Sequence, residues 1–218
     1  MINQKIISKI KLTTKTAYLT GVITGDGNLS NYVKSKKSDL SKDYRITIDI
    51  SDKGYLTFVL KLIKSIIITS TTLKVPSQRG NRIPRLKLQV RNKDLFKFLN
   101  EIMEIPKGAK SSKVFVPSII KDSSANIKKY FLAGYFDTDG GFRGTTLGFT
   151  TGSRSLSDDI SKLLDEFNIS HLLDRWVNKR YNKEFYGIKI KRTEIDNFLS
   201  LLPLQDKEKL GRIYSRFR

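Results

Sequence analysis

AYLTGVITGDG occupies residues 17–27, and a related stretch, FLAGYFDTDG, occupies residues 131–140. Each stretch is mostly apolar, is about two helical turns long and ends in Asp-Gly. Each also has small residues four positions apart: Gly21 and Gly25, then Gly134 and Thr138. Small residues at this spacing let two helix backbones approach closely. We therefore predict two helices packed side by side, which bring Asp26 and Asp139 to the same end of the pair.

The Asp-Gly ends carry two further expectations. Gly27 and Gly140 follow the last helical residue, where glycine suits the left-handed C-cap conformation. Two carboxylates at the negative ends of helix dipoles are disfavoured, and each raises the pKa of the other. A divalent cation would relieve both effects, and Mg²⁺ commonly binds carboxylates together with substrate phosphates.

The stretches LTGVITGDG (residues 19–27) and LAGYFDTDG (residues 132–140) resemble the two signature motifs of single-chain LAGLIDADG homing endonucleases. The resemblance implies an α+β fold of two pseudo-symmetric αββαββα halves. In such a fold the two antiparallel sheets form a DNA-binding saddle, and the motif helices pack at the interface. The chain divides near residues 118–125, which read as a linker, so we expect an N-terminal half at 1–118 and a C-terminal half at 119–218.

Composition favours a polyanionic partner. Lys and Arg number 41 against 21 Asp and Glu, a net charge of +20. A membrane surface or simple solubility would also explain this charge, but the basic residues are scattered along alternating segments, which favours nucleic acid. The chain has no cysteine, which excludes thiolate chemistry, and its one histidine, His171, is expected at the surface or in a loop. No signal peptide and no long apolar run are recognisable, so we expect a soluble, intracellular monomer.

The clearest strand covers residues 85–91, with Leu86, Leu88 and Val90 on one face and basic or amide side chains on the other. Residues 44–50, 142–151, 171–179 and 186–191 are also expected to be strands, whereas residues 28–43 read as a loop or an extended hairpin arm. Helices are expected at 55–67, 94–104, 157–167 and 194–202, and a turn at 76–84. The outer strand faces suit either DNA or solvent. The predicted DNA contacts are Arg45, Thr47, Asp49, Arg82, Arg85, Lys87, Gln89, Arg91, Arg143, Thr145, Arg175, Lys189 and Lys191.

The resemblance also assigns roles around the two aspartates. IPKGAKSSK (residues 105–113) matches the segment in which the family carries a basic active-site residue, which is Lys110 here. Its counterpart in the second half is Lys207 or Lys209. Mg²⁺ or Mn²⁺ would be held by Asp26 and Asp139, together with the backbone carbonyls of Gly25 and Thr138. The sequence departs from the family at Ile50, where a polar side chain is common, while the second half has Thr151 there.

The resemblance implies a site-specific endonuclease for double-stranded DNA. Such an enzyme hydrolyses one phosphodiester in each strand of a long, asymmetric target and leaves short 3′ overhangs. The alternatives are an intron RNA maturase and a catalytically inactive nucleic-acid-binding relative. A generic basic RNA-binding protein is a weaker alternative, because it leaves the repeated Asp-Gly ends unexplained.

Overall fold

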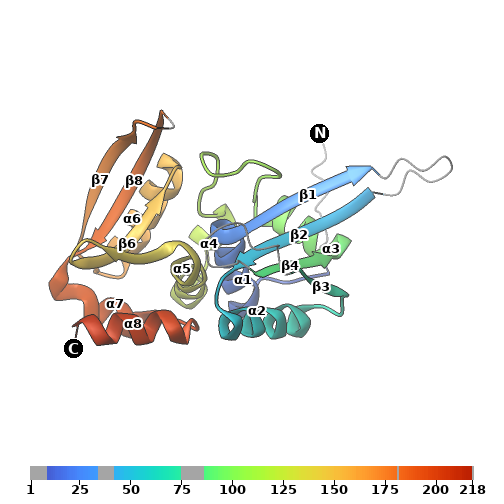
Figure 1. Cartoon of the computed structure of the whole chain (residues 1–218), viewed down its shortest axis with the longest axis horizontal. Coiled ribbons are helices and arrows are strands. Elements are labelled where there is room, and N and C mark those ends of the chain that lie inside the picture. Colours follow the sequence, from blue (N-terminus) through green and yellow to red (C-terminus); the bar gives the residue numbers. More distant parts are fainter. Residues whose placement is uncertain (1–8, 34–41, 75–85, 181, 218) are drawn as a thin grey trace.

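The computed structural model describes residues 9–33, 42–74, 86–180 and 182–217. Two helix-backed antiparallel sheets lie at opposite ends of the molecule, and helices α1 and α5 lie side by side between them (Figure 1). The strand orders are β1-β2-β4-β3 and β5-β6-β8-β7, which is the same topology twice. The predicted α+β fold of two pseudo-symmetric αββαββα halves is confirmed.

The first half begins with α1 (Thr14–Asp26), whose N-terminus is closed by a capping box between Thr13 and Thr16. Its sheet consists of β1 (Gly27–Val33), β2 (Lys42–Ile50), β3 (Thr71–Lys74) and β4 (Leu86–Arg91). Helix α2 (Lys53–Ile66) starts at the N-cap Asp52, and α3 (Lys93–Lys97) continues into a π-helical turn, Phe98–Ile102.

The second half repeats this order after the short helix α4 (Ser118–Lys121). Helix α5 (Ala125–Asp139) leads into β5 (Gly140–Arg143) and β6 (Thr146–Thr151), then α6 (Arg154–Glu166). The hairpin of β7 (His171–Asn178) and β8 (Lys183–Ile190) is followed by a 3₁₀ turn, Arg192–Glu194, and α7 (Ile195–Leu201). Helix α8 (Lys207–Phe217) is an addition at the end.

Helices α1 and α5 pack backbone against backbone. A Cβ atom on Gly21 would lie 2.2 Å from the Phe131 carbonyl oxygen, and one on Gly134 would lie 2.1 Å from the Tyr18 carbonyl oxygen. Both distances are far below van der Waals contact, so only glycine permits this approach. The predicted side-by-side packing is therefore present, and it is buried along residues 16–24 of α1 and residues 131–137 of α5.

The predicted left-handed C-caps are wrong. Gly27 has φ −88° and Gly140 has φ −78°, which is extended backbone available to any residue. Glycine is required there for space instead. A Cβ on Gly27 would lie 2.5 Å from the Ile23 Cα, and a Cβ on Gly140 would lie 2.1 Å from the Phe136 ring.

Several other local expectations need correction. The strand expected at 142–151 is two strands joined by a turn at Gly144 and Thr145. Of the two alternatives for residues 28–43, the described part is the extended hairpin arm and not a loop, because β1 pairs antiparallel with β2. Strand β3 and helix α8 are additional to the predicted elements, and the expected linker contains α4 with its buried Ile120. The turn expected at 76–84 lies outside the described residues.

His171 is not a surface or loop residue. It begins β7, its side chain is only 6% exposed, and its Nε2 lies 2.7 Å from the Ser161 hydroxyl. Its Nδ1 lies 2.9 Å from the Ile169 carbonyl oxygen. Both ring nitrogens are thus engaged in packing β7 against α6.

We predict that Gly134→Ala destabilises the fold by roughly 2–3 kcal/mol, because the new methyl group meets backbone that cannot move alone. Denaturant unfolding measures the change. Gly211→Ala is the matched control. Gly211 lies exposed in α8, and outside the adjoining backbone of that helix no atom of the described residues lies within 4 Å of the place that a methyl group would take. Alanine there should therefore gain up to ~1 kcal/mol of helix propensity. Equal effects at both positions would contradict the close-packing argument.

Candidate nuclease and nucleic-acid-binding site

The α1–α5 pair brings the two motif aspartates together. A Cβ on Gly25 of α1 would lie 2.1 Å from the Thr138 Oγ1 of α5 and 3.3 Å from the Asp139 carboxyl carbon. The Asp139 carboxylate therefore lies beside the last turn of α1, the turn that ends with Asp26. The two acidic residues share one end of the helix pair, as the spacing predicts.

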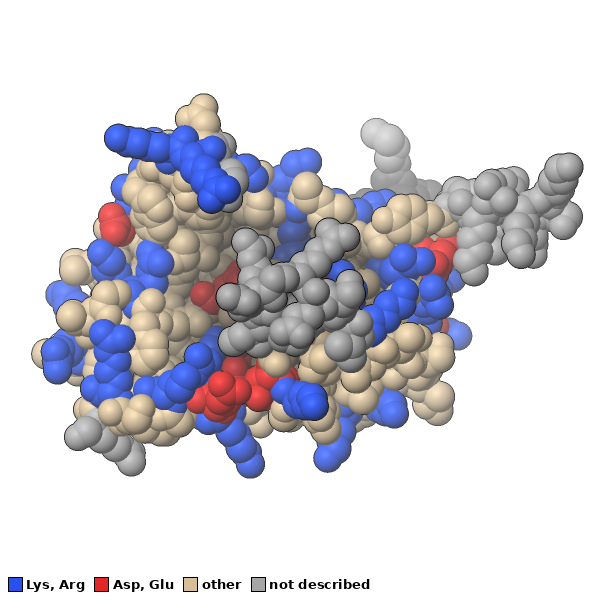
Figure 2. Space-filling view, viewed as in Figure 1, with Lys and Arg blue, Asp and Glu red and all other residues tan. Residues whose placement is uncertain are grey.

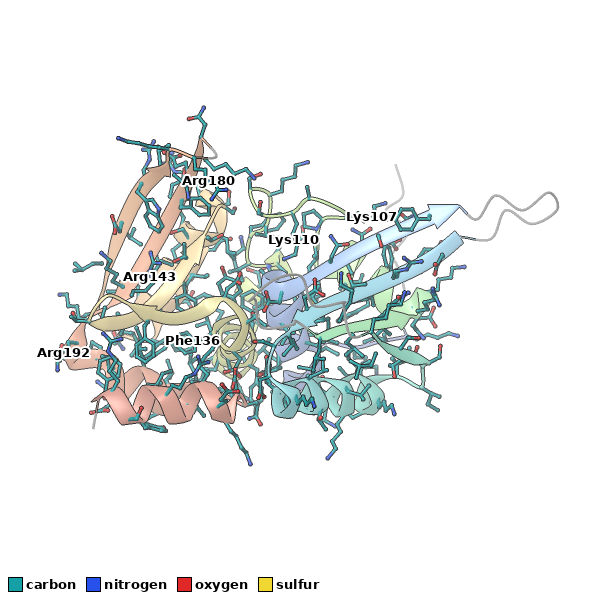
Figure 3. The ribbon with its side chains drawn as sticks, viewed as in Figure 1. Lys107, Lys110, Phe136, Arg143, Arg180 and Arg192 are labelled. Carbon is teal, nitrogen blue, oxygen red and sulfur yellow. The ribbon has the colours of Figure 1, made fainter. Side chains whose placement is uncertain are left out.

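Lys110 caps the C-terminus of α1. Its ammonium donates hydrogen bonds to the carbonyl oxygens of Thr24 and Gly25, the second at 2.6 Å. Neither α1 nor α5 has a basic residue in its own last turn. The positive charge that a helix C-terminus favours comes instead from a lysine far along the chain. Figure 3 shows Lys110 near the centre of the molecule, close to α1 and α5.

Lys209, not Lys207, is the counterpart of Lys110. The Lys209 ammonium donates to the carbonyl oxygens of Phe136 at 2.8 Å, Asp137 at 2.7 Å and Gly140 at 2.9 Å, at the end of α5. It lies 3.5 Å from the Thr138 carbonyl oxygen. Lys207, at the first position of α8, is exposed. The sequence left both Lys207 and Lys209 as candidates, and the position of α8 brings only Lys209 to the end of α5.

Burial and the aspartates act on these lysines in opposite directions. Desolvation lowers the pKa of Lys110, while Asp139 and then Asp26 oppose that change. Desolvation likewise lowers the pKa of Lys209, against the raising effect of Asp137 and three further aspartates. Both motif aspartates act on both lysines, so the four groups form one electrostatic unit.

The outer face of the first sheet carries six of the thirteen predicted contacts, and their charged side chains are already engaged in ion pairs on that face. Asp43 lies 2.6 Å from Arg45 Nη2 and 3.2 Å from Arg91 Nε, and Asp49 lies 3.5 Å from the Lys87 ammonium. Gln89 is 3% exposed rather than open to solvent. With its amide oxygen toward the guanidinium groups, it accepts from Arg45 Nε at 3.0 Å. Thr47 pairs with Gln89 across the strands, whereas Arg82 and Arg85 lie outside the described residues.

The outer face of the second sheet is organised around Arg143. Its guanidinium lies over the Trp176 ring, 5.0 Å from the centroid, and Trp176 stacks on Phe185. Gly187 leaves room for this stack, since a Cβ there would lie 3.0 Å from Arg143 Nη2. Lys189 is on the same face and pairs with Asp174 at 2.9 Å. Figure 3 shows Arg143 on the ribbon of this half.

Three predicted contacts of the second half lie elsewhere. Arg175 pairs across the hairpin with Tyr186, in the row that includes the buried Ile188, so its side chain is on the α6 side of the sheet. There it is bonded to Glu184. Lys191 lies just beyond the end of β8, and Thr145 is in the β5–β6 turn. The alternation of residues 171–179 is too weak to assign the face from sequence.

The charge pattern agrees with this arrangement. Figure 2 shows Lys and Arg side chains over both halves and Asp and Glu side chains gathered near the middle. A cavity of about 220 Å³ at this place is lined by residues of both halves, among them Asp26, Asp52, Asp137, Asp206 and Lys209. Acidic groups are thus concentrated where the halves meet, and basic groups lie around them.

Known proteins share both the sequence signature and the architecture. Residues 126–203 match the LAGLIDADG-like domain family. The structure of I-DmoI in complex with DNA and Ca superposes with a TM-score of 0.67 at 18% identity, and covers 92% of this chain and 97% of that one. The chain has the LAGLIDADG homing endonuclease fold.

Two further similar proteins differ in kind from I-DmoI, so the shared fold does not by itself assign an activity. The N-terminal LAGLIDADG domain of DUF199/WhiA has a TM-score of 0.55 at 17% identity, and covers 97% of this chain and 90% of that one. The replication factor C small subunit of Methanocaldococcus jannaschii is 30% identical over 127 residues. That match covers 58% of this chain but only 7% of the archaeal protein.

The donor set at the LAGLIDADG helix ends suits a hard divalent cation. Two carboxylates and several backbone carbonyl oxygens converge there, and the carbonyls already hold cationic ammonium groups. In the described part of the chain no three acidic or histidine side chains form a metal cluster. The remaining ligands of an ion would therefore be backbone oxygens, water and phosphate, which is the usual situation for Mg²⁺.

One buried polar network near the LAGLIDADG helix ends is absent from the sequence-based prediction. Tyr18 of α1 donates to Asp137 Oδ2 of α5 at 2.5 Å and lies 3.0 Å from the Tyr55 hydroxyl. The backbone N–H of Gln205 donates to the same carboxylate oxygen at 2.7 Å. In the sequence Asp137 is only one residue of the repeated motif. One sequence signal points to Asp137: it is charged, whereas the matching position of the first motif copy has the uncharged Thr24.

Ile50 stands at the position where the resemblance predicts a polar side chain. Ile50 is 5% exposed and ends β2 without a polar group, although it lines the central cavity. Thr151, at the end of β6, uses its hydroxyl to accept a hydrogen bond from the Ser153 N–H.

Among the described residues no helix has both the length and the apolar character needed to cross a membrane.

We predict that Asp137 makes stability depend on pH. Burial raises its pKa from 3.8 to about 6, so the folded chain keeps this proton after the unfolded chain has lost it. The wild type should therefore lose up to about 3 kcal/mol of stability relative to Asp137→Asn as the pH rises from about 4 to 7. Denaturant midpoints at both pH values measure this. The same substitution at the exposed Asp196 is the control, and a pH-independent difference at Asp137 would refute the argument.

Proposed function

We propose that this protein is a site-specific, metal-dependent endonuclease for double-stranded DNA. The observation that carries the proposal is the double set of aspartate and lysine at the ends of α1 and α5, placed between two basic sheet faces. Two partly buried lysines, fixed on backbone carbonyls beside two carboxylates, concentrate opposite charges at one point, which phosphate binding by surface charge does not require. The similar structure of I-DmoI in complex with DNA and Mn supports this proposal, although its sequence is only 16% identical to this chain.

The roles follow from the geometry. Asp26 and Asp139 would hold Mg²⁺ or Mn²⁺, with help from the Gly25 and Thr138 carbonyls, and a bound ion would polarise the scissile phosphates and stabilise the departing oxygens. Lys110 and Lys209 supply fixed positive charge toward the developing negative charge on the phosphates. Because burial lowers the pKa of each lysine, each also loses a proton more readily than an exposed lysine and is suited to orient or activate water.

The two sheet faces would read different halves of the target. The first presents Arg45, Thr47, Lys87 and Arg91, with the buried Gln89 beneath the two arginines, and the second presents Arg143, Lys189 and aromatic rings. Because the faces differ in chemistry, we assign a long, asymmetric site, read by contact and by DNA shape. One aspartate for each strand gives a double-strand break with short 3′ overhangs. The halves are 1–118 and 119–218, and one chain supplies both, so the active form is a monomer.

A second candidate is binding without cleavage. The likeness to the N-terminal LAGLIDADG domain of DUF199/WhiA favours it, because that domain is named for its motif and not for nuclease activity. An RNA maturase or an inactive relative would keep the saddle of two sheets. The buried lysines and both motif aspartates make cleavage the stronger proposal.

The decisive test is cleavage of a randomised double-stranded DNA library with Mg²⁺ or Mn²⁺ and, separately, with Ca²⁺. Asp26→Asn and Asp139→Asn should each lower the rate of double-strand cleavage at the selected site by at least about 100-fold, because each removes a charge from the metal site. Binding to the same duplex should change little. Asp196→Asn, an exposed change on α7, is the control. Tight binding by the wild type with no cutting in Mg²⁺ or Mn²⁺ would favour the second candidate.

A second prediction concerns the DNA-binding face. Arg143→Ala should weaken binding to random-sequence duplex DNA and reduce the slope of log K against log salt by about 1. Arg175→Ala is a matched control on the same sheet, because Arg175 lies on the α6 side and is paired with Glu184. Fluorescence titrations at several KCl concentrations measure both. An equal loss for the two variants would refute the assigned face.

A further inference from the structure

The two lysines at the helix ends are anchored by different means. Lys110 follows Gly108, whose N–H donates to the Leu29 carbonyl oxygen at 2.9 Å and whose carbonyl accepts from the Asn28 side chain at 3.0 Å. Leu29 also forms a parallel bridge with Lys107. The loop that carries the first lysine is therefore fastened to β1 of its own half.

The second lysine is fastened through Asp137. The Asp137 carboxylate accepts the Gln205 N–H at 2.7 Å, directly before the start of α8. Asp206 then caps the helix, because its side chain accepts the Lys209 N–H at 2.9 Å. Two partly buried hydrogen bonds thus fix the first turn of α8, from which Lys209 reaches the end of α5.

The anchor of the second lysine includes a residue of the other half. Tyr18 of α1 donates to the same Asp137 Oδ2 that receives the Gln205 N–H. Asp137 is 3% exposed, and its second oxygen, Oδ1, has no hydrogen-bond partner among the described residues. A buried carboxylate oxygen without a partner is costly, so the position is not optimised for stability. It is optimised for holding two donors at one point.

The corresponding position of α1 works differently. Thr24 occupies the place of Asp137 in the first motif, and its hydroxyl donates to the Thr20 carbonyl oxygen of its own helix at 2.9 Å. Thr24 therefore anchors no distant segment through its side chain in this structure.

We propose that Asp137 is a positioning residue that holds the Lys209 ammonium in place. Through Lys209 it controls the rate at which one of the two DNA strands is cut. The inference rests on the proposed endonuclease function. Asn28 has the matching role for Lys110 and hence for the other strand. The two strands are then cut at rates that can be changed independently, each by a residue that acts through the placement of one lysine.

The test follows the two strands separately. Supercoiled plasmid carrying the site selected by the wild-type protein is cut in Mg²⁺, and the nicking rate of each strand is measured with end labels. Asp137→Thr gives the second motif the residue that the first motif has at this position, Thr24. Threonine is therefore already accommodated near the end of the equivalent helix. This substitution should slow one strand by at least about tenfold, because a displacement on the order of 1 Å at a reacting group can cost about 100-fold. That strand should be the one slowed by Lys209→Met.

Two further variants complete the design. Asp137→Asn keeps an oxygen that can accept from both Tyr18 and Gln205, so it should restore the wild-type ratio of the two nicking rates. Asn28→Ala should slow the opposite strand, the one slowed by Lys110→Met. The ratio within one sample does not depend on the folded fraction, so a partial loss of folding cannot imitate the result.

The outcomes separate this inference from the proposed function. If the wild type cuts neither strand, the proposed function fails and the positioning role falls with it. If the wild type cuts both strands and Asp137→Thr slows both equally, or neither, the positioning role is overturned while the nuclease stands. If Asp137→Thr does not fold, an altered strand ratio in Asp137→Asn would also overturn the inference, because that variant should preserve both hydrogen bonds.

Discussion

The close approach of the α1 and α5 backbones is the contact on which the rest of the structure depends. At Gly21 and Gly134 each helix fills the space that a side chain of the other would need. This contact fixes the distance and register between the two halves. The distance between the motif aspartates and the relative placement of the two sheets both follow from it. A protein with the same sheets but a wider helix pair would keep its basic faces and lose the shared site.

Bringing two helix C-termini together creates an excess of negative charge. Lysines from outside the two helices compensate this charge. Lys110 and Lys209 reach the terminal carbonyls from segments 85 and 72 residues away in the chain, at Gly25 and Asp137 respectively. Each lysine loses hydration and gains carbonyl and carboxylate partners. The same arrangement that stabilises the helix ends therefore also places positive charge beside the aspartates, so structural and proposed catalytic roles coincide in these residues.

The two sheet faces show that net charge alone does not describe the proposed DNA-binding surface. On the first face Asp43 and Asp49 neutralise and orient Arg45, Arg91 and Lys87, whereas on the second face Arg143 is held by an aromatic ring. Carboxylates on such a face reduce non-specific attraction but hold the basic groups in fixed directions. This favours selectivity over affinity.

The sequence by itself determined the repeated motif, the two halves, the α+β class and the presence of Asp26 and Asp139 at one helix end, because helix spacing and strand alternation are local patterns. It also narrowed the second lysine to two candidates. Only the tertiary structure placed Lys209, rather than Lys207, at the end of α5, placed Arg175 on the helix side of its sheet, and showed the contacts of Asp137 with Tyr18 and Gln205. These depend on which distant segments meet: α8 against α5, β7 against α6, and Gln205 against Asp137. No short-range pattern records such contacts, since they arise from packing between elements that are far apart in the chain.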